Sequence, residues 1–431
     1  MQKYKMRLTL QNTCKIFTKS IQNQYKVSFR RTKLDSLFKQ LIPTPFAMFL
    51  ILYLTFSALL AILYTYIMAR TIFFWHELPE WVLPQPFVPH TKITVLIAAR
   101  NEAEHIESCL KAVAQQNYPP SLFEIIVIDD HSDDGTPQRV QQLAIPNLRL
   151  LTLRDFLEKK PEKITSFKKK ALEIGIAHAN GNWIVCTDAD CTMGENWLSL
   201  IVSFLEKKQL QFVAAPVCFH QEKSTFERFQ SLDFVGMMGV TGAGIEGQFM
   251  NMCNGANLAY SKAAFEAVGG FSGIDKLASG DDMLLLQKIA RRFPEQVGFL
   301  KNRAAATFTF AMPTVGAFLQ QRIRWASKSS SYDEKQVTAM LIAVFLLCGN
   351  IFLSLALSMF FAPIFVAFLL QLIAKLIMDF YFLHQMCRYF RRSDLMRTFG
   401  LSFVMHTAYI FTVGALANFS SHYEWKGRRV Q

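Results

Sequence analysis

The sequence contains few charged residues, which make up 18% of its 431 positions, and three long stretches contain none. These uncharged stretches cover residues 46–68, 339–374 and 399–417. A helix of about 20 apolar residues spans a bilayer. The second stretch, continued to residue 383, is long enough for two spans with a turn at Pro363. We therefore expect transmembrane helices over residues 46–70, 338–361, 363–385 and 398–418. A cleaved signal peptide is not expected, because the first apolar run starts late and is long.

Several motifs that would define other protein classes are absent. The eight cysteines form no C-x-x-C pair and have no histidine partner at metal-ligand spacing, so we expect small buried thiols rather than zinc ligands or disulfides. No zinc-finger, RNP or homeodomain pattern is present, which argues against nucleic acid as a partner. The chain also lacks GxGxxG and GxxxxGK[ST], which excludes the dinucleotide fingerprint and the P-loop.

The net charge of +13 is unevenly distributed along the chain. Residues 1–45 form a basic extension with ten Lys or Arg against one acid, Asp35, and further basic residues lie at 388–397 and in a tail over 419–431. Basic clusters beside apolar spans are expected at an anionic membrane surface. The lipid bilayer is therefore the expected partner of these clusters.

The central region, residues 90–335, has the pattern of an α/β domain. "TKITVLIAARNE" indicates a strand that ends in polar residues, and an amphipathic helix follows it. "FEIIVIDDHSDDGT" and "NWIVCTDADC" indicate two more strands that end in acids. Strands alternating with helices predict a mostly parallel sheet, with the ligand cleft at the carboxyl ends of its strands.

One acid pair at a strand end has the composition of a metal site. Asp188 and Asp190 are at positions i and i+2, which point the same way in an extended chain, so both carboxylates could hold one Mg²⁺ or Mn²⁺. Lys168 and Lys169 would help to bind an anionic ligand there. The alternatives are an ordinary polar turn for the acids and a solvated helix start for the lysines.

Six motifs occur in the order typical of one enzyme family. They are "AARNE" (98–102), "VIDDHSDDGT" (127–136), "KKxAL" (168–172), "TDAD" (187–190), "GDDMLL" (280–285) and "QRIRW" (321–325). In these motifs the chain resembles family-2 inverting glycosyltransferases, and most of all the membrane-bound type related to cellulose, chitin, hyaluronan and poly-N-acetylglucosamine synthases. The resemblance implies a GT-A type nucleotide-sugar-binding domain over residues 90–335, beside about four transmembrane helices.

The resemblance also implies roles for individual residues. Glu102, Asp129 and Asp130 would bind the nucleoside of a UDP-sugar, and Asp188 and Asp190 would bind its diphosphate through the metal. Asp282 would be the catalytic base, with Asp281 beside it on the acceptor side. Gln321, Arg324 and Trp325 lie at i, i+3 and i+4 and would form the acceptor site on one helix face. The alternatives are a helix cap for Asp282 and a membrane-interface anchor for Trp325.

The sequence leaves several functional questions open. A lipid acceptor is preferred over a saccharide, with "STFERFQSLDFVGMMGV" as an apolar approach from the bilayer or, alternatively, a core helix. The small number of spans puts a processive polysaccharide synthase in doubt. A non-catalytic nucleotide-sugar-binding membrane protein or a transporter is the alternative of another class, although the spans contain few of the polar residues that transport needs.

The membrane orientation contains a conflict. Nucleotide sugars are cytoplasmic, so we expect an integral membrane protein with a cytoplasmic catalytic domain. One span before that domain and three after it put the basic extension and "KGRRV" outside, against the positive-inside tendency. A first residue at Met48, or a re-entrant N-terminal segment, would remove the first problem. Lys375 and Asp379 at i, i+4 are expected to pair, either for function or as a snorkelling pair.

Overall fold

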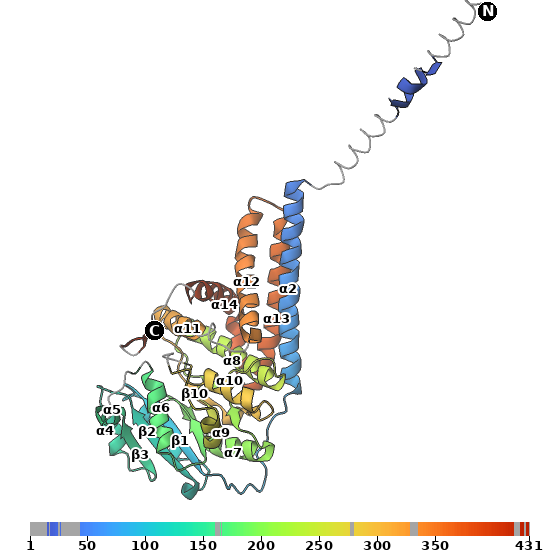
Figure 1. Cartoon of the computed structure of the whole chain (residues 1–431). Helices are drawn as coiled ribbons and strands as arrows, with labels where there is room; N and C mark the ends of the chain where they lie inside the picture. Colours follow the sequence, from blue (N-terminus) through green and yellow to red (C-terminus); the bar gives the residue numbers. More distant parts are fainter. Residues whose placement is uncertain are drawn as a thin grey trace, which may run out of the picture.

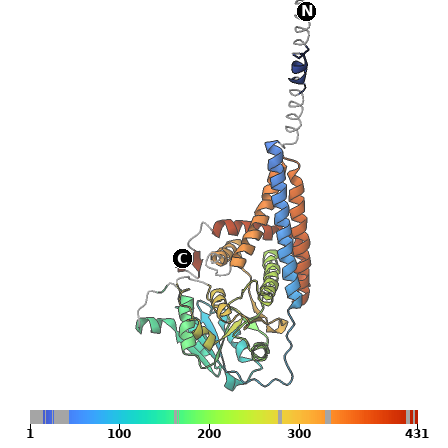
Figure 2. The ribbon, with the colours of Figure 1, turned by 45° about the vertical axis from the view of Figure 1, so that its right-hand side comes forward.

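The structure is a computed structural model. It describes residues 44–159, 164, 166–275, 280–327, 335–417, 423–425 and 428–430, together with 15–16, 18–24 and 26. Most of the basic N-terminal extension lies outside the described residues. Figures 1 and 2 show a helical bundle standing on one side of a mixed α/β domain.

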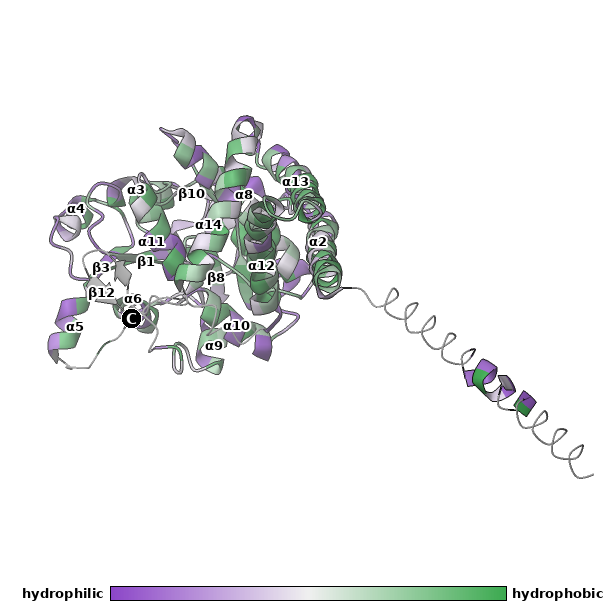
Figure 3. Cartoon of the chain, turned by 90° about the horizontal axis from the view of Figure 1, so that it is seen from above, coloured by the Kyte–Doolittle hydropathy of each residue, from purple (hydrophilic) through white to green (hydrophobic). Residues whose placement is uncertain are grey.

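Three long helices form the bundle (Figure 1). They are α2 (Pro45–Glu77), α12 (Lys335–Ser358) and α13 (Ile364–Tyr389). Pro363 is the N-cap residue of α13, at the position where a turn between two helices was predicted. A fourth helix, α14 (Phe399–Ala417), follows the short helix η4 (Ser393–Thr398). All four are long and apolar enough to cross a membrane, and Figure 3 shows their mostly hydrophobic colouring.

The direction of α14 differs from that of the other three helices. In Figures 1 and 2 it lies across the base of the bundle, beside α12 and next to the α/β domain, instead of running along the bundle. Its side chains Leu401 and Val404 are more than half exposed, whereas Phe403 and Thr407 are buried. One face of α14 is therefore apolar and open, and the other packs on protein.

The α/β domain is built on a seven-stranded sheet of order β3-β2-β1-β4-β8-β6-β9. The first four strands pair in parallel, as expected; β8 is antiparallel to β4 and β6, and β9 is parallel to β6. The inner strands are apolar runs with buried faces on both sides, the pattern of a sheet covered by helices. The bounds are β1 (Ile93–Ala99), β2 (Phe123–Asp129), β3 (Leu148–Thr152), β4 (Trp183–Cys186), β6 (Phe212–Ala214), β8 (Leu258–Ser261) and β9 (Val297–Phe299).

A second sheet of three short strands, in the order β5-β10-β7, lies beside the first. Its strands are β5 (Thr192–Met193), β7 (Val217–Phe219) and β10 (Thr307–Thr309). The helices are α3 (Ile106–Ala114), α4 (Thr136–Gln142), α5 (Leu153–Lys159), α6 (Phe167–Ala177), α7 (Trp197–Lys208), α8 (Thr225–Glu246), α9 (Lys262–Ala267), α10 (Met283–Arg292) and α11 (Val315–Ala326), with the short η1 (Pro120–Leu122) and η2 (Arg303–Ala305). The chain ends in a small pair, β11 (Tyr423–Trp425) and β12 (Arg428–Val430).

The bundle joins the α/β domain through α8. A Cβ added to Gly239 of α8 would lie 2.3 Å from the sulfur of Met386 in α13, and one added to Gly236 would lie 2.7 Å from Leu383. Only glycine allows this close approach of the two helices. The segment proposed as an apolar approach for a lipid is thus mainly buried, in keeping with its alternative as a core helix.

The end of α2 is held by a buried lysine. Lys301 donates hydrogen bonds to the carbonyl oxygens of Trp75 (2.6 Å) and Leu78 (2.7 Å), at the point where α2 ends. A cation at a helix C-terminus satisfies carbonyls that have no partner within the helix. The six cysteines at positions 109, 186, 191, 218, 348 and 387 are buried, as expected for small apolar side chains.

Candidate active site

Asp188 and Asp190 lie in a turn, not on the strand itself. Strand β4 ends at Cys186, and the Cys191 N–H donates to the carbonyl of Asp188 across 3.1 Å, which closes the turn. The alternation of an extended chain, from which a common direction of the two carboxylates was predicted, therefore does not apply to them. Their carboxylates have different partners: Asp188 accepts from Lys168, and Asp190 accepts from the Thr309 hydroxyl at 2.9 Å.

Lys168 connects two acid motifs that are far apart in the sequence. Its Nζ lies 3.1 Å from Oδ1 of Asp188 and 3.5 Å from Oδ2 of Asp281. Burial lowers the pKa of Lys168, but the carboxylates of Asp188, Asp281 and Asp282 outweigh this effect and raise it above its ordinary value. Lys168 therefore stays charged within this acid cluster.

The acid cluster lines a small cavity at the carboxyl ends of β1 and β4. Its polar walls are Lys168, Thr187, Asp188, Asp281 and Asp282, and its apolar walls include Leu96, Leu258, Tyr260 and Phe271. The residues of the "KKxAL", "TDAD" and "GDDMLL" motifs meet here. This is the position predicted for a ligand site in a sheet of this kind.

Asp282 caps the helix that it begins. Its Oδ1 accepts from the Met283 N–H of α10 (2.7 Å), and its Oδ2 accepts from the Gly255 N–H (3.0 Å). Gly255 is close to both motifs, since a Cβ there would lie 3.6 Å from Lys168 Nζ and 3.6 Å from Asp282 Oδ2. The cap that was the alternative for Asp282 is thus present, and it fixes the carboxylate at the cavity wall.

Lys169 has a different environment from its neighbour. It is 2% exposed, and its Nζ donates to the carbonyl of Ile274 across 2.6 Å. The side chain ties α6 to the segment that leads toward Asp281. The nucleotide-binding role predicted for it stays a prediction.

The predicted nucleoside residues gather around the loop after β2. Asp129 and Asp130 are buried; Asp129 accepts from the Ser132 N–H at 3.3 Å, and Asp130 lies 3.0 Å from Nδ1 of His131. The Glu102 N–H donates to the Thr136 hydroxyl at 2.9 Å, which joins this loop to the end of β1. These contacts bring the three predicted residues into one neighbourhood.

The predicted acceptor residues lie on α11, as expected. Gln321 has a buried Oε1 without a hydrogen-bond partner among the described residues. The Trp325 ring packs on Phe234 of α8, with a centroid distance of 6.1 Å. Arg322, which sequence reasoning did not select, is only 4% exposed and lies over that ring at 4.5 Å.

Sequence reasoning missed three residues around the predicted site: Gly255 lines the cavity, Thr309 donates to Asp190, and Arg322 lies over Trp325. Thr309, Gly255 and Arg322 come from β10, a loop and α11, and none has a recognisable local pattern except Arg322, which is inside "QRIRW". Thr309 reaches Asp190 because β10 pairs antiparallel with β5, two residues beyond that acid. Only this long-range strand pairing shows that Thr309 contacts Asp190.

Asp188 and Asp190 fit a divalent cation in part. Both supply hard carboxylate oxygens, yet no group of three His, Cys, Asp or Glu that could hold a metal occurs among the described residues. Mg²⁺ commonly uses one or two protein carboxylates and completes its shell with phosphate oxygens and water. The donor set therefore suits a cation that arrives with a diphosphate.

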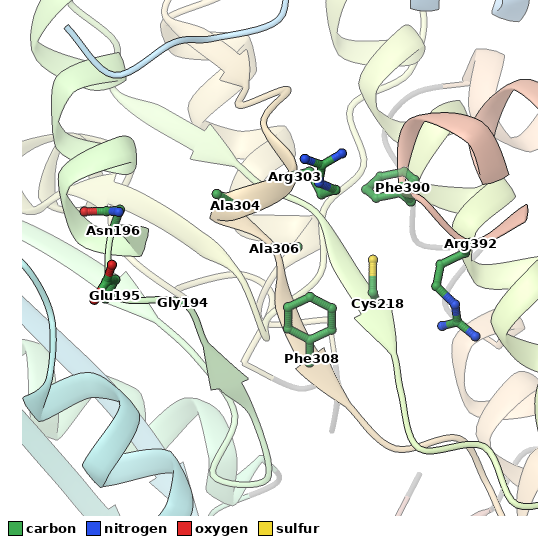
Figure 4. Close-up of a pocket in the computed structure, with 10 residues that line it drawn as sticks. All are labelled: Gly194, Glu195, Asn196, Cys218, Arg303, Ala304, Ala306, Phe308, Phe390 and Arg392. Atoms are coloured by element: carbon green, nitrogen blue, oxygen red, sulfur yellow. The ribbon is translucent and has the colours of Figure 1, made fainter. Parts of the chain in front are cut away.

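A second pocket lies on the far face of the small sheet (Figure 4). It is lined by Gly194, Glu195, Asn196, Cys218, Arg303, Ala304, Ala306, Phe308, Phe390 and Arg392. Neighbouring strand residues point to opposite faces, so Phe308 lines this pocket while Thr309 contacts Asp190. None of the predicted site residues lines it.

Comparison with known proteins agrees with this geometry. Residues 94–269 match the family model described as Glycosyl transferase family 2, and residues 183–420 match Glycosyl transferase family group 2. The chain is 33% identical over 127 residues to Glycosyltransferase AglE of Haloferax volcanii, covering 30% of this chain and 40% of that protein. It is 28% identical over 264 residues to the Probable glycosyltransferase YdaM of Bacillus subtilis, covering 59% of this chain and 58% of the relative.

A polysaccharide synthase and a solved structure are also similar. The chain is 23% identical over 238 residues to the Poly-beta-1,6-N-acetyl-D-glucosamine synthase of Staphylococcus epidermidis, covering 54% of this chain and 53% of that protein. These curated relatives are matched over only about half of their own length. The mannosyltransferase PcManGT from Pyrobaculum calidifontis, solved with GDP-Man and Mn²⁺, shares the fold, with a TM-score of 0.52, 21% identity and coverage of 86% of this chain and 97% of that one.

The second family match covers more than half of the 431 residues and extends from the α/β domain through α12, α13 and α14. It includes the "TDAD" and "GDDMLL" motifs, whose side chains the fold brings to one cavity, and the "QRIRW" motif of α11. The chain therefore belongs to glycosyl transferase family group 2, and its α/β domain has the GT-A fold.

Proposed function

We propose that this enzyme transfers a sugar, with inversion, from a nucleotide-diphospho-sugar to a hydroxyl of a membrane lipid. The observation that carries the proposal is the position of Lys168 between Asp188 of the donor motif and Asp281 of the acceptor motif. A cation between two acid motifs marks the place where a diphosphate and an acceptor can meet. The same geometry serves a saccharide acceptor, including the growing chain of a processive synthase, and the acceptor experiment below separates the two.

The chemistry follows from the cavity walls. The acceptor oxygen forms a bond to the anomeric carbon while the bond from that carbon to the diphosphate oxygen breaks. The acceptor proton passes to a carboxylate, for which we propose Asp282, because two backbone N–H groups hold it at the wall. Lys168 would stabilise the charge that develops on the leaving diphosphate.

We further propose that Asp188 and Asp190 hold Mg²⁺ or Mn²⁺ together with the diphosphate. The bound cation would supply additional positive charge at the leaving group. The Mn²⁺ in the structure of the mannosyltransferase relative supports this proposal. EDTA should abolish transfer, added Mn²⁺ or Mg²⁺ should restore it, and Asp190→Ala should lose that response; activity that survives chelation would contradict a metal role.

The nucleotide is proposed to be a uridine diphosphate, on the resemblance of the Glu102, Asp129 and Asp130 motifs. The mannosyltransferase of similar fold was solved in complex with GDP-Man, so a guanosine diphosphate is the direct alternative. Titration of the purified protein with UDP and GDP, followed by a panel of UDP- and GDP-sugars, decides between them. Tighter binding of GDP would overturn the uridine assignment without affecting the transferase class.

A lipid acceptor is supported by the place of α11. This helix packs beside α14, whose open face is apolar, and both lie at the base of the bundle (Figure 2). The test is mass spectrometry of lipid extracts and of extracted polysaccharide from cells with and without the gene. Loss of a glycolipid supports the lipid acceptor; loss of a long polysaccharide with unchanged glycolipids supports a polysaccharide synthase, as the similarity to one suggests.

We propose that α2, α12 and α13 cross the bilayer and that α14 lies flat along the boundary on the side of the catalytic domain. With three crossings, the loop at 388–397, the basic tail and the catalytic domain share one side, which we propose to be the cytoplasm. The basic C-terminal segment "KGRRV" is then no longer placed outside, so it no longer conflicts with the positive-inside tendency. The conflict over the basic N-terminal extension remains, because α2 is one unbroken helix that leads from residue 45 at one end of the bundle to the α/β domain at the other.

A further inference from the structure

A row of buried polar side chains runs from the bundle to the acceptor helix. Within the bundle, Lys375 of α13 is fully buried and bonds to Asp379 one turn later, which also accepts from the Tyr64 hydroxyl of α2. Lys375 is therefore not a snorkelling residue, since its ammonium points into the protein. Its Nζ also lies 3.3 Å from Nδ1 of His406 in α14.

The row continues from α14 into the catalytic domain. Nε2 of His406 lies 3.6 Å from Oδ1 of Asp233 in α8, and the Tyr409 hydroxyl donates to the same carboxylate at 2.9 Å. Arg322 of α11 completes the row, with its Nη2 at 3.0 Å from Oδ2 of Asp233. Five helices are thus joined, through side chains of which Tyr64, Lys375, Asp379 and Arg322 are buried and the others are partly buried.

The charges of the row balance. Two cationic side chains, Lys375 and Arg322, face two acids, Asp379 and Asp233. Buried ion pairs are weak sources of stability, because desolvation offsets their attraction, and their best-attested use is to select one arrangement of packed elements. Apolar side chains could fill the same space without fixing the rotation of α11.

Arg322 connects this arrangement to the acceptor motif. Its guanidinium is held by Asp233 on one side and covers the Trp325 ring at 4.5 Å on the other. A turn of α11 about its axis would break the ion pair to Asp233 and move the Trp325 ring away from Phe234, both of which belong to α8. The orientation of Gln321, Arg324 and Trp325 therefore depends on an ion pair to α8 and, through it, on the membrane helices.

We propose that the row Tyr64–Asp379–Lys375–His406–Asp233–Arg322 fixes the rotation of α11 relative to the membrane bundle, and that Arg322 and Asp233 are positioning residues for the acceptor. The proposal rests on the proposed acceptor role of α11. It assigns a function to the intramembrane Lys375–Asp379 pair, neither member of which lines the cavity of the acid cluster. Breaking the row is expected to affect acceptor use and to spare donor binding.

The first experiment measures the orientation of α11 without any substrate. Spin labels at Gln320 of α11 and His384 of α13, both exposed, report the distance between these helices in the full chain in lipid nanodiscs. Arg322→Gln and Asp233→Asn should each broaden or shift the distance distribution, while Arg322→Lys, which keeps the charge, should change it less. Lys111→Gln, which removes an exposed pair with Glu107, is the matched control and should leave it unchanged.

The second experiment separates acceptor use from donor use. Transfer of radiolabelled sugar into the lipid extract of membranes should fall on the order of 10²-fold in Arg322→Gln, since misplacement by about 1 Å can cost that much. UDP and GDP affinities should change less than about twofold. A wild-type protein that binds neither diphosphate would refute the proposed function, yet the spin-label distances would still test the row.

A double replacement distinguishes positioning from plain stability. Asp233→Leu with Arg322→Met removes both charges and keeps apolar volume, so it should restore the melting temperature even if the single variants fold poorly. Under the proposal the double variant still has a broader spin-label distance distribution and a lower rate of sugar transfer than the wild-type protein. Recovery of both a narrow distribution and normal transfer would overturn the proposal, as would unchanged distances in all single variants.

Discussion

Asp282 has two roles at the scale of one residue, and substitution separates them. Asp282→Asn keeps an oxygen for the Met283 N–H, so α10 should still be capped. The second accepted bond, from Gly255, is weakened, which costs about 1 kcal/mol of unfolding free energy. Transfer should fall by roughly 10²-fold or more, because an amide cannot take the acceptor proton.

Steady-state kinetics and diphosphate binding check this prediction together. Asp281→Asn is the matched comparison, since Asp281 lies beside Lys168 instead of capping a helix. If Asp282→Asn keeps near-normal turnover and Asp281→Asn has no transfer activity, then Asp281 is the base.

Lys168 is expected to act on the donor side. Lys168→Gln leaves the carboxylates of Asp188 and Asp281 without their shared cation. These negative charges then repel the diphosphate, whose affinity should fall by roughly tenfold, equivalent to about 1.4 kcal/mol. Isothermal titration with UDP measures the loss. Lys170→Gln is the control, because Lys170 pairs with Glu173 outside the cavity and its loss should leave affinity unchanged; equal losses in both variants would contradict the role of Lys168.

At the scale of helices, the contact between α8 and α13 depends on glycine. Gly239→Ala places a methyl group 2.3 Å from the Met386 sulfur, so that side chain must move or the helices must separate, at a cost of about 1–3 kcal/mol in unfolding free energy. Gly316→Ala on α11 is the matched control, since nothing lies within 4 Å of its added Cβ. That variant should be neutral or more stable by up to about 1 kcal/mol. Thermal unfolding in nanodiscs compares the two, and equal melting temperatures would show that the helices pack less closely than described.

At the scale of the whole molecule, three crossings and four crossings predict different positions of the C-terminus. If α14 lies flat, a fluorescent protein fused after residue 431 folds on the cytoplasmic side and fluoresces. Alkaline phosphatase fused after residue 361, at the far end of the bundle, should be active. Four crossings would give an active phosphatase at the C-terminus and a dark fluorescent fusion.

Local chemistry in the sequence determined the four apolar helices, the turn before α13, the parallel strands and the acid clusters at their ends. These features depend on neighbouring residues, whose hydrophobicity and alternation are visible in order along the chain. The joint action of Lys168 with Asp188 was predicted from the residues, whereas the addition of the "GDDMLL" acids came from the resemblance, and the fold brings all three motifs to one cavity. The residue roles in that cavity stay predictions.

Only the tertiary structure decided which partners meet across long separations. Asp190 contacts Thr309 because two distant strands pair, and Lys169 turns away from its neighbour toward the carbonyl of Ile274. The direction of α14 depends on the face it presents to α8 and α11, and hydrophobicity alone is the same for a helix that crosses a membrane and one that lies along it. The pairing of Arg322 with Asp233 likewise has no local sign, because a buried ion pair forms only where two helices carry opposite charges to the same place.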